Sequence, residues 1–300
     1  MSAAKYNSDQ AQQYWKDHYA RRAPVDLDVD PDGLNNVCHP GRPLWFNEYY
    51  ARYQRLVFEK LLSHVDDDLA GSSKRALDVG CGAGRWCRVL AAHGYETTGV
   101  DLQEELIRRN RERLPAVRFV CGSMQDFSSD APFDLITSVT VIQHNPPDAQ
   151  DRMIANMRSI VRCGGQVLAL ENVADQDVHV FASSIDGWIS RFERAGFRMR
   201  RVHRYDYSPF LRADRFVTSN VRRLVGAPAR LLRRPEPQPL PLDPGAPVAS
   251  RATPLRRALQ VARVSALRLL VAADSLVEGA LVEANVPFPT IHCGFQFEAI

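Results

Sequence analysis

Residues 75–207 alternate short apolar runs with amphipathic stretches, and few architectures accommodate such an alternation. Strands that are followed by amphipathic helices are typical of a doubly wound parallel sheet, an α/β fold. The predicted strands are 75–80, 96–101, 117–121, 133–139, 166–171 and 197–205, and the predicted crossover helices are 85–93, 103–114, 149–161 and 183–195. Gly164, Gly165 and Gly196 are predicted to end helices, because glycine adopts the left-handed conformation at low cost.

Two segments lie outside this alternation. Residues 1–70 carry aromatic side chains at helical spacing and are predicted to form a helical cap over the core, 71–207. Residues 208–288 are predicted to form an insertion, with an arginine-rich start, a proline-dense linker and an amphipathic helix near 256–283. Residues 289–300 alternate apolar and polar side chains and are predicted to return to the core as its final strand.

Charge is unevenly distributed along the chain. The 300 residues are 45% hydrophobic with a net charge of +3, which excludes a fibrous or wholly disordered chain and gives no electrostatic case for nucleic acid. Residues 191–234 nevertheless hold thirteen arginines against three acids, a balance of +10, so the rest of the chain is at −7. We interpret these arginines as a solvated face, with a phosphate-bearing ligand or an anionic lipid surface as alternatives.

The six cysteines form no CxxC pair, and the first ten residues are polar. This predicts reduced thiols in a cytoplasmic protein, with neither a disulfide framework nor a metal site. No apolar run reaches the roughly 18 uncharged residues of a membrane span, so no transmembrane segment is expected. Peripheral membrane contact through helix 256–283 stays open, as does the choice between monomer and homodimer.

A glycine-rich turn, Asp78-Val79-Gly80-Cys81-Gly82-Ala83-Gly84, joins a predicted strand to a predicted helix. Glycines at such a turn let the backbone approach a ligand closely, and the free N–H groups at the helix start point toward it. A dinucleotide fingerprint would have its third glycine one residue later, where this chain has Arg85. The spacing therefore disfavours a nicotinamide oxidoreductase.

The pattern Asp78-x-Gly80-x-Gly82-x-Gly84 resembles the first motif of class I S-adenosylmethionine-dependent methyltransferases. Further matches are Gly99-Val100-Asp101, Phe133-Asp134-Leu135-Ile136, Gly164-Gly165 and Glu193-x-x-Gly196-Phe197, so the resemblance covers about 75–207. It implies a Rossmann-like sheet of seven mostly parallel strands with an antiparallel last strand, and S-adenosyl-L-methionine as cofactor.

The resemblance also implies a set of cofactor-binding residues. Asp101 would bind the ribose hydroxyls, and Leu102 would lie against adenine. The family usually has an acid after its third strand, whereas this chain has Ser123, so adenine recognition would fall to Ser123 and the Met124 backbone N–H. The complete predicted set is Asp78, Gly80, Cys81, Gly82, Gly84, Asp101, Leu102, Ser123, Met124 and Val139, with Tyr14 and Trp15 on a covering helix; plain core packing is the alternative for these two.

Methyl transfer to a hydroxyl group needs a base, and His144 follows the strand 133–139 at the edge where parallel-sheet sites lie. Imidazole suits this role at neutral pH, although His144 could instead only close the turn. His39 is a second candidate, in a polar loop where a structural turn is the alternative. His292 and Glu171 could also face the pocket, with ordinary packing as the default.

These observations predict a methyltransferase that acts on a small-molecule acceptor, such as a sugar hydroxyl or another secondary metabolite of natural product biosynthesis. Oxygen is the preferred methylated atom because histidines are available as bases. One alternative is an RNA methyltransferase that uses the arginine-rich segment. The other is a cofactor-binding protein of the same fold, a cyclase or a regulator, without methyl transfer.

Overall fold

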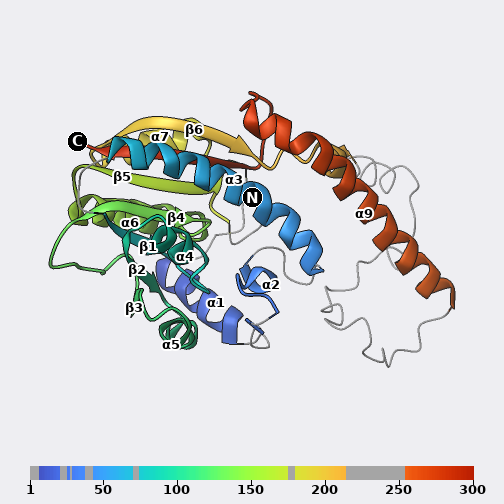
Figure 1. Ribbon diagram of the computed structural model, residues 1–300, viewed down its shortest axis with the longest axis horizontal. Coiled ribbons are helices and arrows are strands. Elements are labelled where there is room, and N and C mark those ends of the chain that lie inside the picture. The colour runs from blue at the N-terminus through green and yellow to red at the C-terminus, as the bar shows by residue number, and fades with distance from the viewer. Residues whose placement is uncertain are drawn as a thin grey trace.

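The computed structural model describes residues 7–20, 26–27, 29–37, 43–69, 74–174, 180–213 and 254–300. Its centre is a seven-stranded sheet in the order β3-β2-β1-β4-β5-β7-β6 (Figure 1). The strands are β1 (Arg75–Val79), β2 (Glu96–Asp101), β3 (Arg118–Cys121), β4 (Phe133–Val139), β5 (Val161–Asn172), β6 (Phe197–Tyr205) and β7 (His292–Ala299). Neighbours among β1 to β5 are parallel, and β7 is antiparallel to both β5 and β6. The predicted fold is confirmed, including its antiparallel last strand.

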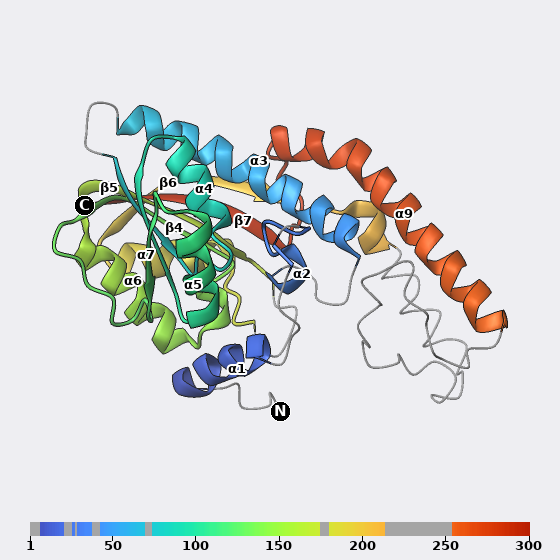
Figure 2. The same cartoon turned by 60° about the horizontal axis from the view of Figure 1, so that its bottom comes forward.

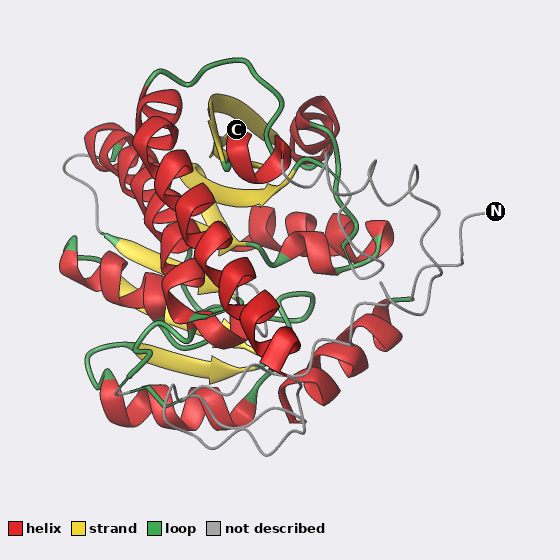
Figure 3. Cartoon of the chain, turned by 90° about the vertical axis from the view of Figure 1, so that its right-hand side faces the viewer, coloured by secondary structure: helices red, strands yellow, loops and turns green. Residues whose placement is uncertain are grey.

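Helices cover both faces of this sheet (Figure 3). The helices of the described part of the chain are α1 (Ser8–Ala20), α2 (Leu34–Val37), α3 (Leu44–Asp68), α4 (Arg85–Ala92), α5 (Glu104–Arg113), α6 (Pro147–Ile160), α7 (Ile185–Arg194) and α9 (Pro254–Glu283), with a 3-10 turn, η1, at Ile142–His144. On one face, Phe58 of α3 stacks on Trp86 of α4 at 4.2 Å between ring centroids. On the other, Phe192 of α7 stacks on Phe297 of β7 at 4.1 Å. Two apolar layers therefore hold the sheet between helices.

The parallel register brings the ends of three strands together at one edge. Val79, the last residue of β1, pairs with Val100 of β2 on one side and with Ser138 of β4 on the other. The segments that follow β1, β2 and β4 therefore start side by side. In parallel sheets this carboxyl edge is where ligands bind.

The predicted helix stop at Gly164 and Gly165 is wrong. Helix α6 already ends at Ile160, and Val161 pairs with Phe133 as the first residue of β5. The pairing shifts register before Leu135 meets Gln166, so the two glycines lie in a bulge inside the strand. Gly164 has φ +71°, and a Cβ at Gly165 would lie 2.9 Å from the Arg162 carbonyl oxygen. Glycine is needed here to bend a strand rather than to end a helix.

The last part of the predicted insertion, α9, lies beside the cap helix α3 (Figures 1 and 2). The Tyr53 hydroxyl donates to the Ser275 carbonyl oxygen at 3.2 Å, and Lys60 pairs with Glu283 at 2.9 Å. Among the described residues, no helix combines the length and apolarity of a membrane span. The proline-dense stretch 235–247 and the loop that carries His39 lie outside the described residues.

Candidate functional site

The glycine-rich turn after β1 has a backbone that only glycine adopts readily. Gly80, Gly82 and Gly84 have φ of +66°, +50° and +76°. A Cβ at Gly80 would collide with the side chain of Val141, which follows β4. The Gly80 and Cys81 N–H groups both donate to the Val100 carbonyl oxygen, at 2.8 and 3.1 Å. The turn is therefore fixed to β2 and closely packed against the segment after β4.

Asp101, at the end of β2, is hydrogen-bonded to this turn. One carboxylate oxygen accepts the Gly82 N–H at 2.9 Å, and the other accepts the Gln103 N–H at 2.9 Å. Burial raises the pKa of Asp101, and these backbone donors oppose the rise. Each carboxylate oxygen has a second lone pair, so Asp101 can still accept hydrogen bonds from a ligand.

Asp78 and Cys81, two further predicted residues, have side chains that are buried in the protein interior. Asp78 is 1% exposed, and its carboxyl group accepts hydrogen bonds from the Thr137 hydroxyl at 2.8 Å and from the Cys87 thiol at 3.4 Å. Burial raises the pKa of Asp78 to about 7. Burial also raises the pKa of the Cys81 thiol to about 11. Both side chains support the turn from inside the protein.

The segment after β4 is held by Glu171 from the end of β5. Thr140 has φ +57°, which is strained for a β-branched residue. The fully buried Glu171 carboxyl group accepts the backbone N–H groups of Ile142 and Gln143 at 3.1 Å each and the Ser138 hydroxyl at 3.1 Å. Burial raises the pKa of Glu171 to about 7. Glu171 therefore follows the default interpretation of a packed residue, because its oxygens accept hydrogen bonds from the start of η1 and from Ser138.

Helix α1 lies across the ends of β2, β3 and β4. The Trp15 ring contacts the His144 ring edge-on, at 4.4 Å between centroids. The Gln103 side chain donates to the Trp15 carbonyl oxygen at 3.3 Å, and the Gln12 side chain donates to the Ser123 hydroxyl at 3.5 Å. The structure therefore brings His144, Trp15 and Ser123 to one edge, although 129 residues separate Trp15 from His144.

The remaining predicted residues lie along the same edge. Leu102 follows β2 directly, Val139 ends β4, and the Tyr14 ring packs edge-on against Trp15 at 5.3 Å. Met124 is buried, and its carbonyl oxygen accepts the Asn156 side-chain amide at 2.8 Å. Only His39 among the predicted residues cannot be placed, because it lies outside the described part of the chain.

Arg85 connects the glycine turn to the cap, a role that the sequence did not predict. Its guanidinium donates to the Gln54 side chain at 2.8 Å and to the Ala51 carbonyl oxygen at 2.7 Å, both in α3. Its Nε also lies 3.6 Å from the Asp32 carboxylate. The sequence feature that could have indicated this role is the position of Arg85, which directly follows the last glycine of the motif.

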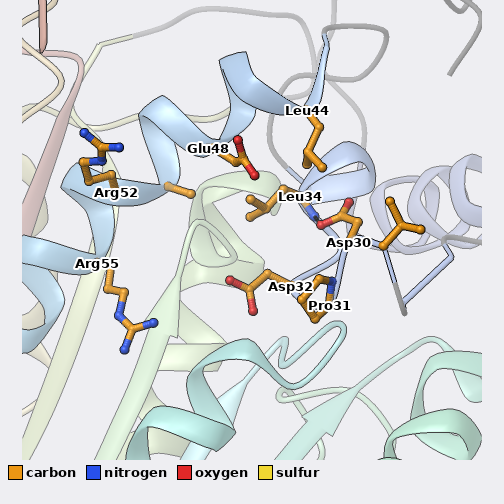
Figure 4. Close-up of a pocket in the computed structure, with 10 residues that line it drawn as sticks. Asp30, Pro31, Asp32, Leu34, Leu44, Glu48, Arg52 and Arg55 are labelled. Atoms are coloured by element: carbon orange, nitrogen blue, oxygen red, sulfur yellow. Dashed lines mark hydrogen bonds between the residues drawn. The ribbon is translucent and has the colours of Figure 1, made fainter. Parts of the chain in front are cut away.

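A cavity of about 210 Å³ lies beside this connection, between α3 and the chain before α2. Figure 4 shows the Asp32 carboxylate near its centre, with the arginines of α3 on one side. Its lining is Val29, Asp30, Pro31, Asp32, Leu34, Leu44, Glu48, Ala51, Arg52 and Arg55. None of these residues belongs to the predicted cofactor set, although Asp32 of the lining also contacts Arg85, which follows the glycine turn.

Comparison with known proteins identifies the domain. Residues 76–165 match the family model of the methyltransferase domain. The chain is 33% identical over 147 residues to a ubiquinone biosynthesis O-methyltransferase of Coxiella burnetii, with 47% of this chain and 62% of that protein covered. It is 32% identical over 149 residues to the protein of the same name from Aromatoleum aromaticum, with 48% and 63% covered.

A solved structure with a related fold is the 1,6-didemethyltoxoflavin-N1-methyltransferase of Burkholderia thailandensis. It is 18% identical with a TM-score of 0.48, and 68% of this chain and 85% of that chain are covered. The match to the methyltransferase domain spans residues 76–165 and includes the glycine turn, in line with the resemblance that the glycine motif carries. The chain spans less than two thirds of the length of the curated relatives named above.

Proposed function

We propose that the protein transfers a methyl group from S-adenosylmethionine to a hydroxyl group of a small-molecule acceptor. The glycine turn carries this proposal, because its three glycines have left-handed φ values, a Cβ at Gly80 or Gly84 would lie within 3 Å of another side chain, and the Gly82 N–H is held by Asp101. The match to the methyltransferase domain supports the same cofactor. The names of the two curated relatives support oxygen as the methylated atom.

The described residues fit this cofactor. Asp101 has free lone pairs for the ribose hydroxyls, and Leu102 directly follows it. The backbone from Gly80 to Gly84 would face the methionine part, while Asp78 shapes the turn from below. The adenine and the methyl end would be enclosed by side chains that the edge brings together: Ser123, Met124, Val139, Tyr14 and Trp15.

When bound, the cofactor supplies an electrophilic sulfonium methyl group, whose bonding pair to sulfur stays on sulfur as the methyl is displaced. His144 then accepts the proton of the acceptor hydroxyl at an imidazole nitrogen, so that an oxygen lone pair is free to attack. The Trp15 ring beside it limits how the imidazole can turn. Helix α1 covers this edge and reduces the access of water to the reacting atoms.

The RNA methyltransferase alternative is disfavoured by the arginines of the described segment. Arg191 pairs with Asp151 at 2.5 Å, and Arg198 and Arg200 lie 2.7 and 3.4 Å from Glu298. These guanidinium groups face carboxylates of the same chain, so their charge is partly neutralised where RNA phosphates would have to bind.

The test is calorimetric titration with S-adenosylmethionine, followed by isotopic methyl transfer to a panel of hydroxylated acceptors. We expect binding, and transfer that His144→Ala lowers about 100-fold with little change in cofactor affinity. The matched control is His93→Ala, because His93 directly follows α4 and pairs with Asp66 away from the carboxyl edge. Binding without transfer to any acceptor would favour the cofactor-binding alternative, and a normal rate in His144→Ala would remove His144 as the base.

A further inference from the structure

His292, Tyr205 and Asp206 lie together at the β6 end of the carboxyl edge of the sheet. His292 begins β7 and pairs with Asn172, the last residue of β5, and with Tyr205, the last residue of β6. Asp206 follows Tyr205 directly. Because β7 is antiparallel, its first residue lies at the carboxyl edge, the edge that also holds the glycine turn and His144. Two strand spacings, about 10 Å, separate β7 from β4.

Asp206 orients the His292 ring. Nδ1 of His292 lies 2.9 Å from a carboxylate oxygen of Asp206, which assigns the proton of a neutral imidazole to Nδ1. Nε2 then carries a lone pair, and no residue in the described part of the chain makes a hydrogen bond to it. The side chain is 16% exposed. A ligand hydroxyl could therefore donate to Nε2.

Tyr205 provides a second observation at this place. Its ring stacks on His292 with 5.3 Å between centroids and 20° between planes. The residue is 3% exposed, yet among the described residues its hydroxyl has no hydrogen-bond partner. The Gln54 side chain of α3 is a nearby hydrogen-bonding group and lowers its pKa, but the two groups do not reach hydrogen-bond geometry. Leaving a buried hydroxyl unpaired is costly, so this group favours a hydrogen-bond partner that the described residues do not supply.

The turn after β6 is held by α9. Asp206 and Ser208 have φ of +62° and +39°, and the Ser208 hydroxyl donates to Asp206 at 2.8 Å. Glu278 of α9 accepts the Tyr207 and Ser208 N–H groups at 2.8 Å each. Such a strained turn persists only when its surroundings hold it, and strain of this kind gathers at functional sites.

The charges around Tyr205 restrict what can bind. Its pKa is raised well above its ordinary value by burial and then by the carboxylates of Asp206 and Glu171. Glu278 also lies at the turn. An anionic group at this position would meet like charges in a poorly solvated place, whereas a neutral hydroxyl would meet acceptors.

We propose that His292 and Tyr205, oriented by Asp206, form an acceptor-binding subsite that takes a hydroxyl group of a neutral, hydroxyl-rich molecule such as a sugar. This inference rests on the proposed function, because it places the acceptor between this subsite and His144. An acceptor that reaches both must span the region between β4 and β7. The subsite binds and orients the acceptor, and it excludes phosphorylated or carboxylated forms at this end.

The test is binding of neutral probes to the full chain with S-adenosylhomocysteine present. The probes are methyl glycosides of common hexoses and 6-deoxyhexoses, together with the matching hexose 6-phosphates. Saturation-transfer NMR measures their binding. We expect saturable binding of at least one neutral glycoside and weaker binding of its phosphate. His292→Asn keeps a donor toward Asp206 but lacks Nε2, and it should weaken glycoside binding about tenfold without changing the affinity for S-adenosylhomocysteine.

Tyr205→Phe is the decisive variant. Removing an unpaired buried hydroxyl should leave the melting temperature unchanged or raise it, whereas glycoside binding should fall several-fold. Absence of glycoside binding, undiminished binding in both variants, or tighter binding of the phosphates would overturn the subsite. Failure of the proposed function would look different, since the unaltered chain would then either not bind S-adenosylhomocysteine or transfer no methyl group to any acceptor, whatever the two variants do to glycoside binding.

Discussion

At both ends of the carboxyl edge a carboxylate accepts backbone N–H groups, but the donors lie at very different separations along the sequence. At the β2 end, Asp101 accepts N–H groups from Gly82 and Gln103, 19 and 2 residues away. At the β6 end, Glu278 accepts N–H groups from Tyr207 and Ser208, 71 and 70 residues away. In both places a carboxylate holds a turn that includes left-handed residues.

This difference in sequence separation follows the boundary between the part of the chain that matches a known domain and the part that does not. The β2 end lies within residues 76–165, which match the methyltransferase domain, whereas the β6 end lies beyond them. The first turn uses glycines, whose backbone takes left-handed conformations freely. The second uses Asp206 and Ser208, so it needs the carboxylates of α9 to hold it.

The largest expected effect tests the glycine turn. Gly80→Ala should reduce the affinity for S-adenosylmethionine by about 1000-fold, because it combines a strained φ of +66° with a collision against Val141. Calorimetry measures this loss. Gly122→Ala is the control, since a Cβ there meets nothing within 4 Å. Equal affinities for the two variants would show that the turn tolerates a side chain.

Glu171→Ala should lower the free energy of unfolding by about 3 kcal/mol, because buried N–H groups at the start of η1 lose their acceptor. Glu171→Gln keeps one side-chain oxygen and should lose less. Urea denaturation compares the two variants. If both were as stable as the unaltered chain, the segment after β4 would not depend on β5.

Asp101→Ala should weaken S-adenosylmethionine binding at least tenfold, by about 1.5–3 kcal/mol, because charged hydrogen bonds to the ribose are lost. Asp130→Ala, an exposed position in the loop after β3, is the matched control. Calorimetric affinities that agree for both variants would contradict the assignment of Asp101 to the ribose.

The smallest effect concerns pH. Burial raises the pKa values of Asp78, Glu171 and Glu278 to about 7, so the folded state binds more protons than the unfolded chain between about pH 4.5 and 7. This contribution to stability is complete below the unfolded pKa values and is lost as pH rises through 7. The melting temperature should fall by a few degrees from pH 5.5 to 8.

Glu278→Gln should flatten part of this pH dependence while keeping an acceptor for the turn after β6. Thermal melts of both proteins at several pH values measure the difference. A melting temperature that rises with pH, or an identical slope in the variant, would refute the assignment of these carboxylates.

The sequence predicted the strands closely because each strand is a local apolar run, and it predicted the glycine turn because its residues are neighbours. It misjudged Gly164, since a bulge inside a strand and a helix stop use the same left-handed residue. It could not choose between a pocket-facing and a packed Glu171, because the donors that occupy its oxygens are 28–30 residues away, after the end of another strand.

By itself, then, the sequence determined the doubly wound sheet, its family resemblance and the glycine turn, all of which depend on periodicity and on short spacings. Only the tertiary structure decided that His292 gains a carboxylate partner 86 residues away and that α9 holds the turn beside it. The physical reason is that a hydrogen bond across the fold depends on strand order and register, which no local pattern of side chains specifies.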